Sequence, residues 1–130
     1  MTDTRFCRHH VLVVDDEPFT RQLIRGLLQQ LGVGSLDDAA EGEAAMVSVL
    51  HRRPDLVLCD VHMRPVGGIE FLRSLRSLAI PQIARTRVVF LTADAKADTV
   101  RQARELGVDG YLVKPVSLGA VEQRLVRLLT

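Results

Sequence analysis

The sequence predicts a doubly wound α/β protein, in which one parallel β-sheet is covered by helices on both faces. Short apolar runs alternate with segments of helical periodicity from residue 11 onward, which is the pattern of repeated βαβ units. Residues 11–14 and 56–59 are apolar throughout, as expected for parallel strands that are buried on both faces. A chain of 130 residues with 47% hydrophobic residues is long enough for one such domain with a full core.

The first strand is expected at residues 11–14, and the helix after it should begin at Pro18 and end before Gly32. Proline favours the first turn of a helix, and glycine commonly ends one. Four leucines of this helix repeat at helical spacing, so we expect that face to pack on the sheet. They are Leu23, Leu27, Leu28 and Leu31.

The second strand, near residues 33–37, is the least regular one, because Gly34 and two aspartates dilute its apolar residues. An edge position in the sheet tolerates such a strand. The second helix is expected from about residue 43 to 51 and should stop before Pro54, since the residue ahead of a proline avoids the helical conformation. Residues 56–59 then form the central third strand.

After a loop at residues 61–68, a helix is indicated by three apolar residues at helical spacing, Ile69, Leu72 and Leu75. Residues 78–87 contain a proline and show no clean period. Residues 88–91 follow as a buried fourth strand.

The next helix is expected from about residue 96 to 106, and Gly107 can end it in the left-handed conformation. Residues 111–113 form the fifth strand. Ser117 is a suitable N-cap for a last helix. The apolar face of that helix consists of Leu118, Val121, Leu125 and Leu128.

Charge and cysteine content narrow the expected partners and compartment. The chain has 17 Lys and Arg against 16 Asp and Glu, which argues against a surface for nucleic acid or membranes and favours proteins or small ions as partners. Two cysteines make no disulfide framework, and residues 1–10 form a polar N-terminal tail without the apolar stretch of a signal peptide. We therefore expect a cytoplasmic domain at residues 11–130, with no membrane insertion and no attached output domain.

Polar side chains follow four of the predicted strands: Asp15 and Asp16 the first, Asp60 the third, Thr92 the fourth and Lys114 the fifth. The carboxyl ends of parallel strands meet at one edge of the sheet, where open α/β sheets bind their ligands. Each residue alone could be a helix cap or part of a turn. Together they indicate a site built from three carboxylates, a hydroxyl and an amine.

Three carboxylates at one point favour a hard divalent cation. Mg²⁺ is typically held by one or two carboxylates together with phosphate oxygens and water, and Mn²⁺ also suits carboxylate ligands. We expect direct ligation by Asp16 and Asp60, and ligation through water by Asp15. If Asp60 is also a nucleophile, its carboxylate attacks a phosphoryl group, and Lys114 and the Thr92 hydroxyl stabilise the phosphoryl oxygens. The product would be an aspartyl phosphate.

With these residues in this order, the chain resembles the receiver domains of two-component response regulators, in particular the stand-alone chemotaxis type. The matching motifs are Val13-Val14-Asp15-Asp16-Glu17, Asp60 with Gly68, Phe90-Leu91-Thr92-Ala93, and Gly110-Tyr111-Leu112-Val113-Lys114-Pro115. As an ordered set they are highly specific, unlike any single motif among them. The resemblance covers residues 11–128 and implies a flavodoxin-like fold, with a five-stranded parallel sheet in the order 2-1-3-4-5 and five helices.

The resemblance implies that Asp60 accepts a phosphoryl group from a sensor histidine kinase or a histidine phosphotransfer protein. The implied metal shell consists of Asp15, Asp16, Asp60 and the backbone carbonyl of His62. Thr92 and Lys114 would bind the phosphoryl oxygens, and Lys114–Pro115 would be a cis peptide. Such domains catalyse only their own phosphorylation and dephosphorylation and turn over no external substrate.

The resemblance also implies a switch. On phosphorylation Thr92 would move toward the phosphate while Tyr111 turns inward, which remodels the face made by the fourth helix, the fifth strand and the fifth helix. His62, Ala93 and Asp94 occupy positions that tune how long the phosphate survives. The partner of the switched face would be a flagellar motor, a phosphotransfer protein, a kinase or another effector. The domain would be a monomer that could dimerise on phosphorylation.

The loop after Asp60 departs from the family pattern. Arg64 stands where the family commonly has proline, Pro65 comes one residue later, and Gly67 replaces an acid or amide. The segment Arg64-Pro65-Val66-Gly67 therefore puts the conformation and partner contacts of this loop in question.

Two other functions compete with the phosphorylated switch. One is a Mg²⁺-dependent phosphatase of the haloacid dehalogenase kind, which also forms an aspartyl phosphate. Those enzymes place Asp-x-Asp after the first strand, whereas the acids here are adjacent. The other is a docking module that is never phosphorylated.

Overall fold

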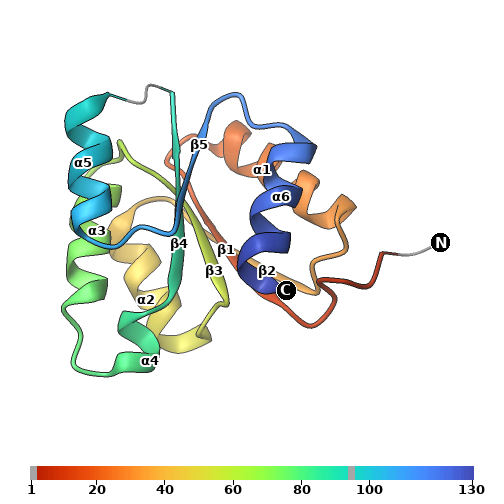
Figure 1. Cartoon of the computed structure of the whole chain (residues 1–130), viewed down its shortest axis with the longest axis horizontal. Coiled ribbons are helices and arrows are strands. Elements are labelled where there is room, and N and C mark those ends of the chain that lie inside the picture. Colours follow the sequence, from red (N-terminus) through yellow and green to blue (C-terminus); the bar gives the residue numbers. More distant parts are fainter. Residues whose placement is uncertain (1–2, 94–95) are drawn as a thin grey trace.

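The strands form one parallel sheet between two layers of helices (Figure 1). The computed structural model describes residues 3–93 and 96–130. The strands are β1 (His10–Val14), β2 (Ser35–Ala39), β3 (Leu56–Asp60), β4 (Arg87–Thr92) and β5 (Gly110–Val113). They lie in the order β2-β1-β3-β4-β5, and each pairs in parallel with its neighbours, which confirms the predicted strand order.

Helices cover both faces of the sheet. In Figure 1, α1 (Pro18–Gln30) and α6 (Leu118–Leu129) lie on one face, and α2 (Gly42–Arg52), α3 (Gly68–Arg76) and α5 (Ala97–Glu105) lie on the other. The register places Val14 of β1 beside Cys59 of β3, and Asp60 beside Leu91 of β4. The carboxyl ends of the central strands therefore meet at one edge, where the predicted site residues begin.

The described residues contain one helix more than the five predicted. The additional helix, α4 (Pro81–Ala84), is a single turn that leads into β4. Pro81 stands at its start, and Ile83 and Ala84 are buried against the domain. A turn of four residues is too short to show a helical period, which explains why the sequence did not reveal it. The fourth and fifth helices of the family pattern are therefore α5 and α6 here.

The side chains of β1 alternate between two apolar layers. Leu12 and Val14 point into the layer shared with α2, α3 and α5, whereas Val11 and Val13 point into the layer shared with α1 and α6. All four side chains are fully buried. This two-sided burial is the reason that the central strands are apolar at every position.

The buried stripe of α1 differs from the one predicted. Leu23 is 54% exposed, and Ile24 and Leu28 are the helix residues that are fully buried. Leu31 follows in the same stripe, and Leu27 lies at its margin. In α6 the prediction was also wrong at one position, because Leu118 is 38% exposed.

Several element boundaries shift by one or two residues. β2 begins at Ser35 instead of residue 33, because the turn after α1 still contains Val33 and Gly34. Ser117 caps α6 as predicted, accepting a hydrogen bond from the Ala120 N–H at 3.1 Å. Gly107 has the left-handed conformation expected after α5, with φ of 79°.

The described residues before β1 pack on the domain, in the stretch where the sequence predicts a polar N-terminal tail. Phe6 is fully buried in the α1 and α6 layer. Its carbonyl accepts a hydrogen bond from the Gly34 N–H at 3.1 Å, and Arg5 forms an ion pair with Glu122 of α6. One aromatic residue within a polar stretch gave too weak a signal to predict this. Among the described residues, no helix is long and apolar enough to cross a membrane.

Candidate functional site

Three carboxylates converge at the carboxyl ends of β1 and β3. Asp15 directly follows β1, Asp16 comes next in the chain, and Asp60 is the last residue of β3. One oxygen from each of them lies within 4.8 Å of the other two. Asp15 is fully buried, Asp60 is 8% exposed, and Asp16 is open to solvent. The cluster thus consists of two buried acids and one that is open to solvent.

Lys114 reaches into this cluster from the end of β5. Its Nζ lies 2.9 Å from Oδ2 of Asp15 and 3.4 Å from Oδ2 of Asp60. The second oxygen of Asp15 accepts a hydrogen bond from the Glu17 N–H at 2.9 Å. Asp15 is therefore held on both carboxylate oxygens, and the amine of Lys114 bridges the two buried acids.

Burial and neighbouring charges shift the pKa values of both Asp60 and Lys114. Burial raises the pKa of the Asp60 carboxyl above its ordinary value, and the negative charge of Asp15 raises it further. Lys114 and the backbone N–H of His62 act in the opposite direction. Burial alone would lower the pKa of Lys114, but the two carboxylates outweigh it and the pKa is raised. Lys114 is therefore charged at neutral pH.

Three acids against one amine leave an excess of negative charge in a partly buried site. A divalent cation offsets that excess, and carboxylate oxygens are the ligands that Mg²⁺ prefers. Because Asp16 is exposed, a cation can reach the cluster from solvent. The donor set therefore fits Mg²⁺.

Thr92 is the last residue of β4, one position beyond the partner of Asp60 in the sheet, and it is fully buried. Its carbonyl accepts a hydrogen bond from the Lys114 N–H at 2.7 Å. Tyr111 lies beside Phe90 in the β4–β5 register, and the two rings meet edge to face with centroids 6.0 Å apart. Burial raises the pKa of the Tyr111 hydroxyl. Thr92 and Tyr111 thus lie on the neighbouring strands β4 and β5, and their role in a switch stays a prediction.

The loop between β3 and α3 forms the wall of the site. Its His62 donates its backbone N–H to the Asp60 carboxylate, while the imidazole points to solvent. A pocket of about 380 Å³ opens beside Asp16 and is lined by this loop. The loop segment that departs from the family pattern includes a cis peptide at Arg64–Pro65, and Lys114–Pro115 is also cis.

Glycine is required where the loop returns to the helix. A Cβ at Gly68 would lie 2.5 Å from the carbonyl oxygen of Asp60, so a larger residue would displace the acceptor strand. The loop is also fastened to the start of α2. Val66 accepts a hydrogen bond from the Gly42 N–H at 2.8 Å and donates one to the Glu41 carboxylate at 3.3 Å. The contribution of Glu41 was missed in the sequence, since an acid before a helix is an ordinary cap.

Comparison with known proteins decides the family. The model of the response regulator receiver domain matches residues 11–126 of the chain. The chain belongs to the receiver domain family. It is 30% identical to chemotaxis protein CheY-3 of Vibrio cholerae over 115 residues, which cover 88% of this chain and 87% of that protein. It is also 30% identical to chemotaxis protein CheY of Pseudomonas aeruginosa, with 91% and 94% covered.

Solved structures agree with this assignment. Chemotaxis protein CheY4 of Vibrio cholerae superposes with a TM-score of 0.84 at 29% identity, covering 92% of this chain and 98% of that one. The CheX–CheY–BeF3–Mg complex from Borrelia burgdorferi gives a TM-score of 0.84 at 27% identity, with 94% and 90% covered. The receiver domain is CheY-like and belongs to two-component signalling, not to a class of enzymes with external substrates. The phosphatase alternative is thereby set aside.

Two of the three residues predicted to tune the phosphate lifetime are described: His62 lies in the loop after Asp60, and Ala93 directly follows Thr92. The side chains of His62 and Ala93 are exposed. Asp94 falls outside the described residues. Their effect on the lifetime stays a prediction, as does the ligation of a metal by the His62 carbonyl.

Proposed function

We propose that this receiver domain is a Mg²⁺-dependent phosphoryl acceptor that switches a protein-binding face. Asp60 would receive the phosphoryl group from a sensor histidine kinase or a histidine phosphotransfer protein. The observation that carries the proposal is the environment of Asp60. Its carboxylate lies at the mouth of the site, 3.4 Å from the Lys114 amine and next to two further acids that can hold a cation.

The chemistry is a transfer between a donor histidine and a carboxylate. An oxygen of Asp60 forms a bond to phosphorus as the bond from phosphorus to the donor nitrogen breaks, and the imidazole leaves with the electron pair. The Lys114 ammonium and the Thr92 hydroxyl would stabilise the charge on the phosphoryl oxygens. Dephosphorylation is a separate hydrolysis, in which water attacks phosphorus as the bond from phosphorus to the Asp60 oxygen breaks; inorganic phosphate leaves and the Asp60 carboxylate is restored.

Asp15, Asp16 and Asp60 would hold the Mg²⁺, together with the backbone carbonyl of His62. When bound, the cation neutralises the negative charge that accumulates as a phosphoryl group approaches the acids. The CheY relative from Borrelia burgdorferi, whose structure is described as a complex with BeF3 and Mg²⁺, supports this cofactor. The raised pKa of Asp60 gives a reason for the requirement, because a cation favours the ionised, nucleophilic carboxylate.

The switched face would consist of α5, β5 and α6. Thr92 ends β4 beside the acceptor, and Tyr111 of β5 borders a surface hollow of about 400 Å³ that also includes Val100 and Arg104 of α5 and Arg127 of α6. Movement of Thr92 toward a phosphate would be transmitted to Tyr111 and change this hollow. The Borrelia relative is described in complex with another protein, CheX, which supports a protein as the output partner. The switch would act in the cytoplasm.

The proposal is tested by intact mass spectrometry after incubation with acetyl phosphate, with and without Mg²⁺. The wild-type domain should gain one phosphoryl group only when Mg²⁺ is present, and Asp60→Asn should gain none. Asp98→Asn is a matched control, because Asp98 is exposed on α5 and pairs only with Arg101 among the described residues. An Asp60→Asn variant that is phosphorylated like the wild type would refute Asp60 as the acceptor.

A further inference from the structure

Asp16 takes its position from the backbone alone. The Asp15 carboxylate is fixed by Lys114 and by the Glu17 N–H, at 2.9 Å each. The Asp16 carboxylate, in contrast, makes no hydrogen bond or ion pair with another residue in the described part of the chain. Its direction toward a cation therefore depends on the orientation of the peptide that joins Asp15 to Asp16.

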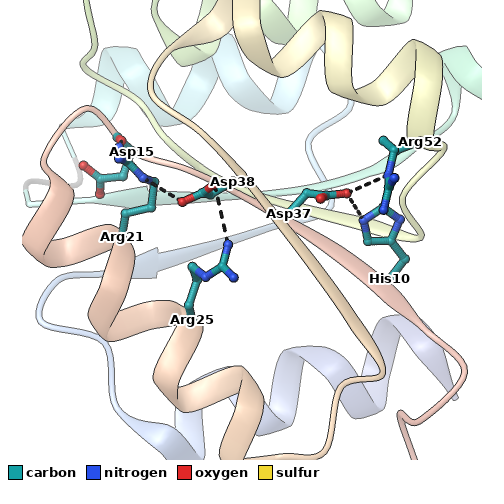
Figure 2. A network of polar contacts seen from close by, with 7 residues as sticks. All are labelled: His10, Asp15, Arg21, Arg25, Asp37, Asp38 and Arg52. Atoms are coloured by element: carbon teal, nitrogen blue, oxygen red, sulfur yellow. Dashed lines mark hydrogen bonds and ion pairs between the residues drawn. The ribbon is translucent and has the colours of Figure 1, made fainter.

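That peptide is held by Arg21 of α1. Nη1 of Arg21 donates a hydrogen bond to the Asp15 carbonyl oxygen at 2.6 Å (Figure 2). Nε of the same guanidinium donates to Oδ2 of Asp38 at 3.1 Å, and Nη1 of Arg25 lies 3.5 Å from the other oxygen of Asp38. The guanidinium is therefore clamped between an anionic side chain and the backbone of the acidic pair.

Asp38 is placed for this role by the sheet. It lies on the edge strand β2 directly beside Val13 of β1, two residues before Asp15. Its side chain faces α1, where both arginines reach it (Figure 2). An aspartate weakens a strand, but here it aligns an arginine whose planar guanidinium can bind two acceptors at once.

We propose that Arg21 is a positioning residue of the Mg²⁺ site, which orients Asp16 through the Asp15 carbonyl and is itself aligned by Asp38. The inference rests on the proposed Mg²⁺-dependent function and extends it to residues that do not touch the cation. Outer groups that orient metal ligands commonly change metal affinity by tenfold or more when they are removed.

The charge of Arg21 and its positioning role predict opposite changes in Mg²⁺ affinity when Arg21 is replaced. Arg21 brings a positive charge close to three carboxylates, so its removal would by charge alone strengthen the binding of Mg²⁺. If Arg21 orients Asp16, its removal weakens binding. We expect Arg21→Gln to bind Mg²⁺ about tenfold more weakly than the wild type. Arg25→Gln also removes one positive charge and a contact to Asp38, but it leaves the hydrogen bond from Arg21 to the Asp15 carbonyl intact. Its affinity for Mg²⁺ should therefore equal or slightly exceed that of the wild type.

The experiment is a Mg²⁺ titration followed by amide chemical shifts, together with the thermal midpoint measured without Mg²⁺. Arg21→Gln loses its bond to the Asp15 carbonyl as well as its ion pair with Asp38, so its midpoint should fall further than that of Arg25→Gln. The midpoints show whether both variants fold, and a purely structural role of Arg21 would lower its midpoint without weakening the binding of Mg²⁺. Asp38→Asn should weaken Mg²⁺ binding less than Arg21→Gln, and the double variant Arg21→Gln/Asp38→Asn should bind no more weakly than Arg21→Gln alone.

Wild-type affinity in Arg21→Gln would overturn the inference while leaving the proposed function intact. If Arg21→Gln does not fold, Asp38→Asn decides instead, and an unchanged Mg²⁺ affinity in that folded variant overturns the inference. A wild-type domain that does not bind Mg²⁺ would refute the proposed cofactor and this inference together.

Discussion

Replacing Lys114 by methionine should destabilise the domain when Mg²⁺ is absent. The Lys114 amine is the cationic partner of Asp15, which is fully buried, and it also lies 3.4 Å from Asp60. Methionine retains much of the apolar stem but removes the charge. Two carboxylates that are close together and largely buried would then lose the group that offsets their repulsion.

The magnitude follows from burial. Removing one member of a buried ion pair costs about 3–5 kcal/mol, because the remaining charge is left uncompensated. The Lys114 side chain is 22% exposed, so water screens part of the loss, and binding of a proton by Asp60 can relieve a further part of it. We therefore expect the free energy of unfolding to fall by about 2–3 kcal/mol at neutral pH.

Urea denaturation followed by circular dichroism measures this loss. Arg101→Met is the matched control, because its partner Asp98 is 83% exposed and the change should stay below about 0.5 kcal/mol. The deficit of Lys114→Met should shrink as the pH falls below neutrality toward the raised pKa of Asp60, since protonation of Asp60 removes one of the two charges. A Lys114→Met variant within about 0.5 kcal/mol of the wild type would refute the coupling inferred for Lys114 and the two acids.

Two further substitutions, Asp60→Asn and Phe6→Ala, test the site and the fold, and Phe19→Ala is the control for the second. Asp60→Asn should raise the free energy of unfolding above pH 7 by on the order of 1 kcal/mol, because it removes a carboxylate whose ionisation is opposed by burial and by Asp15. The pKa of Asp60 is raised in the folded state, so the folded protein binds that proton more tightly and the gain should shrink as the pH falls through this pKa. Phe6→Ala should cost about 3–4 kcal/mol, because the ring is fully buried, whereas Phe19→Ala, at a side chain that is 71% exposed, should cost less than about 0.5 kcal/mol.

The opposite change in stability would contradict the prediction for Asp60→Asn, and equal stability of the two phenylalanine variants would contradict the prediction for Phe6→Ala. If Asp60→Asn is less stable than the wild type at pH 8, the attraction of Lys114 outweighs the burial of the carboxylate. If Phe6→Ala and Phe19→Ala unfold at the same urea concentration, the segment before β1 does not belong to the folded core.

The parts of the fold set by local rules were predictable. Short apolar runs marked the strands β1, β3, β4 and β5, and in a parallel sheet the polar residues that follow such strands meet at one edge. That is why Asp15, Asp60 and Lys114 could be brought together without coordinates. The burial of each was not predictable, because it depends on how the loops close over the strand ends.

The parts set by distant contacts were missed. Phe6 is buried in the apolar layer that includes residues of α1 and α6, and no periodicity in the sequence marks its burial. The turn at α4 is too short to show a pattern. Arg21 and Asp38 carry no motif, since their pairing depends on the alignment of β2 beside β1. These are contacts between elements, and a single sequence gives little sign of them.

The central claim is that modification of Asp60 is transmitted to the α5, β5 and α6 face. Addition of beryllofluoride and Mg²⁺ to the domain, followed by amide chemical shifts, tests it directly. We predict chemical-shift changes at Asp60 that extend through Thr92 to Tyr111 in the wild type, and none of these changes in Asp60→Asn. Shifts confined to the acidic cluster, or the same shifts in Asp60→Asn, would contradict it.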